Sequence, residues 1–405
     1  MLRMSVFAGL SGSCRSATKT KTTENMKTRL LSLFAALSCL AFSGCEDDST
    51  WLVKTTDGPM EITRIVNPKT YEPVSVAALD QLILVEGKNL NNVATIFIND
   101  VEAVKPTDMI PVNGSILVRV PYIVPTVVDN KIKLTDKQGR NVEYPLEVTV
   151  PELVVSGMSC EYAPAGSTLV ISGSYFDLYG MTPDNGVVRF GDVETPIVAS
   201  NKTSVTVQVP GNAPANSKLT LVSDIMTAEC PGKYKDSDCL LQTFEGNSWN
   251  DTYKIAYVSG PNDPDHGEAD DPAGISGKYM RYHNTYVGGW AWQGFDWPLI
   301  NNRPNDFDTN AASYALKFEC YAVKTLADPI LMIIPIEGGQ SDYRWGGDET
   351  FPTGEWRTCT IPLTETVADI ASWINTAQAQ FVFHAAGTMK ESYWCIDNVR
   401  ISKIK

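Results

Sequence analysis

The chain has 405 residues, of which 43% are hydrophobic and 20% charged, so roughly two to four globular domains are expected, and collagen, coiled coil and general disorder are excluded. Its net charge of -14 argues against nucleic acid as a partner, because phosphate backbones are bound through a basic face. With only 3 histidines and no Cys-x-x-Cys pair, the sequence offers few ways to build a zinc or iron site.

The amino end carries the pattern of an export signal. Two basic residues follow Met26, an apolar stretch occupies positions 30–42, and Ser43, Gly44 and Cys45 come next. The apolar stretch is shorter than the roughly 20 residues that span a bilayer, so a cleaved signal is favoured over a membrane helix. The final three residues resemble a bacterial lipobox, with phenylalanine where leucine is usual before them. This implies lipidation of Cys45; an ordinary cleavage site beside a chance cysteine is the alternative.

Three acidic residues at positions 46–48 follow the predicted lipid cysteine. Such a run resembles the surface-export signal of Bacteroidota lipoproteins. We therefore assign residues 1–45 to an upstream extension and lipoprotein signal peptide, and residues 46–57 to a surface linker.

From about residue 58 the chain reads as all-β, with short runs of Val, Ile, Leu and Thr separated by Gly, Pro, Asn and Asp. Two segments share one layout: a Gly-centred hairpin, a short strand ending in Asn-Asp or Gly-Asp, and a strand closing on Val-Pro. The first reads LILVEGKNL, ATIFIND and ILVRVP, and the second reads TLVISGSYF, VVRFGD and VTVQVP. Both resemble the IPT/TIG family of immunoglobulin-like domains, which implies one sandwich at 58–150 and a second at 151–237.

Six cysteines follow Cys45, and an exported chain permits disulfides between them without requiring any. Cys230 and Cys239 flank a polar segment and could close a small loop. By contrast, buried free thiols are expected for the three cysteines that lie inside apolar strand-like runs, which are Cys320, Cys359 and Cys395.

The last segment, 238–405, differs in composition from the two before it. Of 9 tryptophans only Trp51 precedes it, and core packing alone would not predict this imbalance between neighbouring β-domains. We therefore place the functional surface in this segment. One helix-like stretch is expected at 363–375, and the rest reads as strands.

The stretch 279–298, YMRYHNTYVGGWAWQGFDWP, predicts a sugar-binding platform. In an extended strand Trp290 and Trp292 share one face, about 6.6 Å apart along the chain, with Trp297 on the other. Indole rings can stack on the apolar C–H faces of pyranose rings, and neighbouring glycines would let a ligand approach the backbone. His283 and Gln293 are near enough in sequence to bond sugar hydroxyls. The alternative is that both tryptophans are buried in the core.

Tyr343 and Trp345 repeat the i, i+2 aromatic spacing beside a second glycine pair, so they are candidates for the other half of the platform. Burial in an ordinary strand is an equal alternative for them. Trp356 and Trp394 are expected mainly to support the sandwich.

Two groups of carboxylates are candidates for calcium, which takes six to eight oxygen ligands in a flexible cage. The loop 261–272, PNDPDHGEADDP, lacks the full EF-hand pattern, so a solvated acidic loop is favoured there. Glu245 and Asp397 would lie on the first and last strands of a jelly roll. In that arrangement they resemble a structural calcium site of many carbohydrate-binding modules, and calcium is the one cofactor that we consider.

No feature predicts an enzyme. The segment lacks a Gly-x-Ser-x-Gly elbow and a Gly-rich phosphate loop, and no spacing singles out a glycosidase acid and nucleophile. A hydrolase is therefore the third choice, behind two kinds of binding protein.

Taken together, these features resemble the surface glycan-binding proteins of Bacteroidota polysaccharide-utilisation systems, and residues 238–405 resemble their xyloglucan-binding type of C-terminal domain. The resemblance implies an all-β chain in which two immunoglobulin-like (IPT/TIG) sandwiches precede a C-terminal jelly-roll carbohydrate-binding-like β-sandwich. It implies a non-catalytic, lipid-anchored protein of the outer membrane, exposed on the cell surface.

The same resemblance implies that the protein binds polysaccharide, such as the plant β-glucan xyloglucan, for uptake by a TonB-dependent transporter and its SusD-like lipoprotein. The main alternative is a surface adhesin or structural lipoprotein that binds a protein partner through an exposed aromatic patch.

Overall fold

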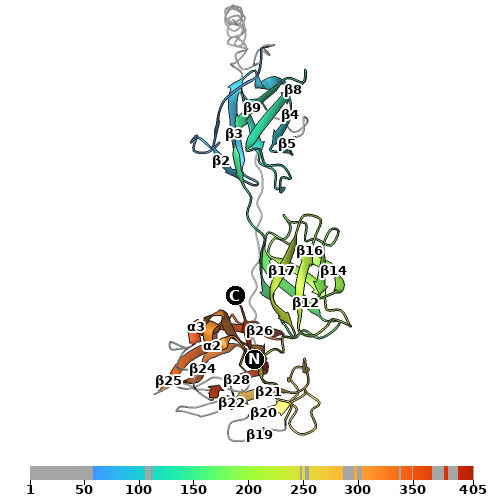
Figure 1. Ribbon diagram of the computed structural model, residues 1–405, viewed down its shortest axis with the longest axis vertical. Coiled ribbons are helices and arrows are strands. Elements are labelled where there is room, and N and C mark those ends of the chain that lie inside the picture. Colours follow the sequence, from blue (N-terminus) through green and yellow to red (C-terminus); the bar gives the residue numbers. More distant parts are fainter. Residues whose placement is uncertain are drawn as a thin grey trace, which may run out of the picture.

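The structure is a computed structural model that describes residues 58–104, 111–112, 114–246, 249–250, 255–285, 296–298, 303–336, 339–348, 350–366, 378–381 and 391–404. Three β-domains follow one another along the longest axis, and an extended segment joins the first to the second (Figure 1). The predicted all-β class, with two sandwiches ahead of a larger C-terminal one, is confirmed. Within the described ranges, no helix has both the length and the apolar character needed to cross a membrane.

The first domain packs two antiparallel four-stranded sheets, β1-β3-β7-β6 and β5-β4-β8-β9, and adds the parallel pair β10-β2. In β3, Ile83 and Val85 are fully buried while their neighbours are half-exposed, as the period of two in a half-buried strand requires. The elements are β1 (Glu61–Val66), β2 (Val76–Ala78), β3 (Leu82–Lys88), η1 (Leu90–Asn92), β4 (Val93–Ile98), β5 (Val101–Val104), β6 (Pro111–Val112), β7 (Ser115–Arg119), β8 (Lys131–Asp136), β9 (Asn141–Pro145) and β10 (Glu147–Thr149).

In the second domain, seven antiparallel strands follow one continuous path, β11-β12-β15-β14-β13-β16-β17. The path folds back on itself at β14, where a register shift between Ile197 and Ala199 bends the strand. The strands are β11 (Val154–Met158), β12 (Thr168–Ser174), β13 (Val187–Phe190), β14 (Val193–Ser200), β15 (Ser204–Gln208), β16 (Ser217–Val222) and β17 (Thr227–Tyr234).

The internal repeat has a geometric cause at its glycine. A Cβ on Gly87 would lie 1.9 Å from the carbonyl oxygen of Glu61, and a Cβ on Gly173 would lie 2.1 Å from that of Val154. In both domains the opposite strand carries a register shift at this point. Only glycine permits this approach of two backbones beside a bulge, so the Gly-centred hairpins mark equivalent positions in the two sandwiches.

The C-terminal domain packs a large antiparallel sheet, β19-β20-β21-β28-β23-β26 with β18 on β28, against a smaller sheet, β22-β27-β24-β25. Its main core, between the sheets, includes the fully buried Phe318 and Trp394. The elements are β18 (Leu240–Gln242), β19 (Trp249–Asn250), β20 (Ile255–Val258), β21 (Tyr279–Asn284), β22 (Asp296–Pro298), α2 (Phe307–Asn310), η3 (Ala311–Ser313), β23 (Tyr314–Ala322), β24 (Leu326–Ile336), β25 (Gly339–Asp348), β26 (Trp356–Pro362), α3 (Leu363–Thr366), β27 (Gln378–Phe381) and β28 (Ser392–Lys403).

The expected helix at 363–375 begins where predicted, as α3, and positions 367–375 lie outside the described residues. The cysteines from Cys160 onward are buried thiols without a disulfide. This confirms the expectation for Cys320, Cys359 and Cys395, whereas the loop closure considered for Cys230 and Cys239 does not occur.

Candidate functional site

The acidic loop 261–272 is tied to the outer face of the large sheet. The buried carboxylate of Asp271 accepts hydrogen bonds from Arg281 Nη1 at 2.9 Å and from the Tyr393 hydroxyl at 2.8 Å. Arg281 Nη2 also binds Glu268 Oε1 at 3.0 Å. Asp263 accepts the backbone N–H groups of three neighbouring loop residues, at positions 259, 265 and 266. These carboxylates are engaged within the protein, which argues against a calcium cage. The expectation of a solvated loop is also wrong for Asp263 and Asp271, which are buried where the loop packs on the sheet.

His283, a candidate for contact with sugar hydroxyls, lies on β21 with both ring nitrogens engaged. Nδ1 is 2.6 Å from Glu268 Oε2, and Nε2 is 3.0 Å from Glu391 Oε1. The imidazole stacks on the Tyr393 ring with 4.0 Å between centroids. The His283 side chain is 29% exposed, and both its nitrogens face carboxylates. A ligand that reached the ring would therefore lie beside Glu268 or Glu391.

Tyr343 and Trp345 lie on β25, at one edge of the smaller sheet, and both pack against the main core of the domain. The Trp345 ring makes edge contacts with Phe318 at 5.0 Å and with Phe351 at 6.0 Å between centroids. Partial burial raises the pKa of Tyr343. The two side chains therefore combine a packing role with a partly exposed edge, and their contact with ligand stays a prediction.

Trp290, Trp292 and Gln293 lie outside the described residues, as does Cys45. The next strand along the chain is β22, which contains Trp297 and forms the opposite edge of the sheet that carries Trp345. The edge strands β22 and β25 are three strand spacings apart, or about 14 Å. The strand that follows Trp290 and Trp292 in sequence and the strand that carries Tyr343 and Trp345 are therefore the two edges of one sheet.

Two other tryptophans support the sandwich as expected. Trp394 on β28 is 1% exposed and packs beside Tyr282 with 5.2 Å between centroids. Trp356 on β26 donates its indole N–H to the carbonyl of Ala273 at 3.0 Å and contacts Tyr279 edge-on.

Glu245 and Asp397 approach the same short turn, because the first and last strands of the domain, β18 and β28, are paired. Ser276 Oγ donates to Asp397 Oδ2 at 2.7 Å, and the Lys278 N–H donates to Glu245 Oε2 at 3.3 Å. Between them, a Cβ on Gly277 would lie 2.2 Å from Glu245 Oε1, so the carboxylate needs glycine there.

The electrostatic environment of Asp397 is unfavourable for a carboxylate. Burial raises its pKa to about 8, and the negative charges of Glu319 and Glu245 add to this effect. Across the described ranges no three His, Cys, Asp or Glu side chains gather as metal ligands, so a cation here would also need hydroxyl or main-chain oxygens.

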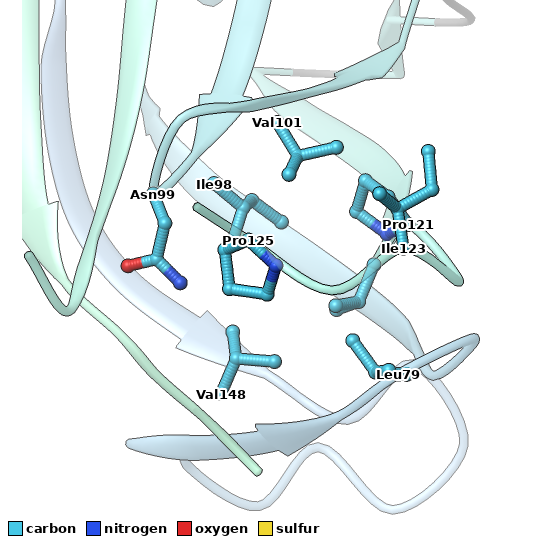
Figure 2. A pocket seen from close by; sticks show the side chains of 9 residues that line it. Leu79, Ile98, Asn99, Val101, Pro121, Ile123, Pro125 and Val148 are labelled. Carbon is cyan, nitrogen blue, oxygen red and sulfur yellow. The ribbon is translucent and has the colours of Figure 1, made fainter. Parts of the chain in front are cut away.

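A pocket in the first domain is too small to be a glycan site. Figure 2 shows apolar side chains, including Leu79, Ile98 and Val148, around a shared space at one end of the sandwich. Its volume is about 10 Å³, close to that of one water, and its lining is almost entirely apolar.

Sequence reasoning missed the buried charged residues of the large sheet. Arg281, Glu319 and Arg400 are each at most 2% exposed, on strands otherwise rich in apolar residues. The available signal was the pattern itself: CIDNVRIS places the polar residues Asn398, Arg400 and Ser402 at alternating positions of the last strand, and such alternation usually indicates an exposed face.

The fold defines the class of protein: a modular all-β chain in which two smaller sandwiches precede a larger C-terminal β-sandwich. Residues 234–403 match the family model of the surface glycan-binding protein B xyloglucan-binding domain. Residues 153–229 match the model of the IPT/TIG domain. For residues 58–150, membership of the IPT/TIG family stays a prediction, although their sandwich shares the hairpin geometry described above.

Two solved structures are similar to the chain. The surface glycan-binding protein B of Prevotella bryantii superposes with a TM-score of 0.51 at 20% identity, covering 86% of this chain and 99% of that one. The corresponding protein from a complex xyloglucan utilisation locus of Bacteroides uniformis has a TM-score of 0.49 at 18% identity, covering 86% and 100%. No curated protein matches the chain. At 20% identity, the similarity to the Prevotella bryantii protein establishes a shared fold.

Proposed function

We propose that this protein is a non-catalytic glycan receptor of the cell surface that binds polysaccharide through its C-terminal domain. The observation that carries the proposal is the match of residues 234–403 to a xyloglucan-binding domain family. The place of this domain, at the far end of a row of immunoglobulin-like domains, suits capture of a large extended ligand (Figure 1).

The ligand we propose is a plant cell-wall β-glucan such as xyloglucan. Trp290 and Trp292 would stack on the C–H faces of its sugars, which desolvates apolar carbon while the hydroxyls stay wet. Tyr343 and Trp345 would extend the platform from the other edge strand of the same sheet, using the parts of their rings that the core leaves exposed. Affinity per site would be modest, and many copies on one surface would add retention through multivalency.

We further propose that Cys45 carries the lipid that anchors the protein to the outer membrane. The domains between this cysteine and the C-terminal domain would act as a spacer. In such a location the receptor would pass polysaccharide to a TonB-dependent transporter and its SusD-like lipoprotein. The sequence features that support this are the lipobox-like segment and the acidic run that follows it.

A structural calcium ion between Glu245 and Asp397 is a separate proposal. It is supported by the oxygen-rich turn at 276–278 and by the raised pKa of Asp397, which is caused first by burial and then by the charges of Glu319 and Glu245; a cation would stabilise the ionised carboxylate. Calcium would supply no chemistry; it would hold the middle of β28, at Asp397, against the turn.

Affinity electrophoresis of the fragment from Ser49 to Lys405 tests the receptor function. Gels cast with xyloglucan should retard the fragment, and the double variant Trp290→Ala, Trp292→Ala should migrate freely with an unchanged melting temperature. Trp51→Ala, in the linker, is the matched control and should be retarded like the wild type. Free migration of the wild type through xyloglucan, other β-glucans and mannan would instead favour a protein-binding adhesin, and release of reducing ends would indicate a hydrolase.

A further inference from the structure

The central strand of the large sheet, β28, is buried on both faces. Trp394 and Ile396 point into the core between the two sheets, whereas Cys395 belongs to a cluster on the opposite, outer face. Beyond a bulge at Asn398, the outer face carries Arg400 and is still buried. An antiparallel sheet usually exposes one face to water, so some other part of the chain must cover this face.

The cover includes the second immunoglobulin-like domain, which contributes one carboxylate to a buried cluster. Arg400 binds Glu319 with Nη1 and Nη2, at 2.7 and 3.0 Å, and Nη2 also lies 2.6 Å from Oε2 of Glu161. Lys317 Nζ donates to the other oxygen of Glu161. The four side chains are at most 5% exposed.

Within this cluster, the C-terminal domain provides two cations, Lys317 and Arg400, and one anion, Glu319. Glu161 of the second domain provides the second anion and balances the charge. A buried charge left without its partner is strongly destabilising, because neither water nor a counter-charge then solvates it. The C-terminal domain therefore takes one counter-charge of its buried cluster from a residue outside it.

Hydrogen bonds and apolar contacts join the same two domains. Thr358, on the edge strand β26, donates its N–H to the Ser159 carbonyl at 2.9 Å and accepts the Glu161 N–H at 2.7 Å. Ile275, from the loop that follows the acidic segment, belongs to the hydrophobic core of the second domain, and Trp356 packs against that core. By contrast, an exposed hydrogen bond of 3.2 Å, from the Tyr122 hydroxyl to Asp177, links the first and second domains.

We propose that the second immunoglobulin-like domain and the C-terminal domain form one cooperative folding unit, in which Glu161 is a positioning residue that completes the charge balance under β28. The functional module is then residues 151–404 and not the C-terminal sandwich alone. This inference rests on the buried contacts and holds whatever ligand the protein binds.

Denaturant unfolding of the fragment from Ser49 to Lys405, which holds all three domains, tests the proposal with two probes. Residues 58–237 contain no tryptophan, so apart from Trp51 in the linker the tryptophan fluorescence follows the C-terminal domain. Hydrogen exchange at the amides of β12 and β15 follows the second domain. In the wild type both probes should report the same guanidinium midpoint. Two separate midpoints would overturn the proposal without any mutation.

Substitutions then test the role of the charge. Glu161→Gln should lower both midpoints together and reduce protection of the β12 amides by about 100-fold. Glu194→Gln, in an exposed pair with Arg189 on the same domain, is the matched control and should leave both unchanged. Adding Lys317→Met to Glu161→Gln leaves one buried cation with one anion and should recover part of the loss. A double variant no more stable than Glu161→Gln would overturn the charge-balance argument.

Discussion

The replacement Asp271→Asn should destabilise the C-terminal domain strongly although it changes one atom. The Asp271 side chain is fully buried and holds Arg281, itself 2% exposed, together with the Tyr393 hydroxyl. Removing one partner of a buried ion pair costs about 3–5 kcal/mol. Arg281 keeps Glu268 at 3.0 Å, and that carboxylate is 38% exposed, so we expect the lower end, about 3 kcal/mol.

Guanidinium titration followed by tryptophan fluorescence measures this cost. A loss of about 3 kcal/mol corresponds to a midpoint lower by roughly 0.5–1.5 M for the usual dependence on denaturant. The control is Asp270→Asn on the adjacent, exposed residue, which should stay within about 0.5 kcal/mol of the wild type. If both variants lost the same small amount of stability, Asp271 would not be holding the loop to the sheet, and the structural role assigned to its buried carboxylate would be wrong.

Three further predictions concern stability, metal and thiols. With calcium removed by a chelator, the pKa of Asp397 at about 8 lies above its ordinary value of 3.8, so the contribution of this group to stability is present below pH 8 and is lost as the pH rises through it. Stability should therefore fall by about 2–3 kcal/mol from pH 6 to 9; Asp397→Asn should abolish that slope, and a slope that persists would contradict the assignment. Adding calcium at pH 8 should raise the melting temperature of the wild type but not of Glu245→Gln; equal responses would remove calcium from this turn. Because burial raises the pKa of Cys239 to about 11, a thiol reagent at pH 8 should leave it unmodified until the protein unfolds, and rapid labelling of native protein would contradict its burial.

Much of the fold was predictable because its signals are local. The glycines of the repeated hairpins are required where two backbones meet, so Gly87 and Gly173 appear in the sequence at equivalent positions of the two sandwiches. Alternation of apolar and polar residues likewise marks the strands. The burial of Trp394 and the unpaired state of Cys395 followed from their apolar neighbours.

The site was less predictable because it depends on contacts between distant segments. His283 reads as a free hydrogen-bonding side chain in sequence, yet Glu268 and Glu391 occupy both its nitrogens. The spacing of Tyr343 and Trp345 describes a shared face but not whether that face meets ligand or core. Glu161 and Arg400 are 239 residues apart, and no periodicity relates them.

Calorimetric titration of the fragment from Ser49 to Lys405 with a xyloglucan oligosaccharide tests the central claim most directly. The account predicts a saturable heat of binding for the wild type and no saturable heat for the double variant Trp290→Ala, Trp292→Ala. Neither protein should release reducing ends from the oligosaccharide during incubation. The absence of saturable heat from the wild type with xyloglucan and with every other β-glucan would contradict the claim that this chain is a surface receptor for these polysaccharides.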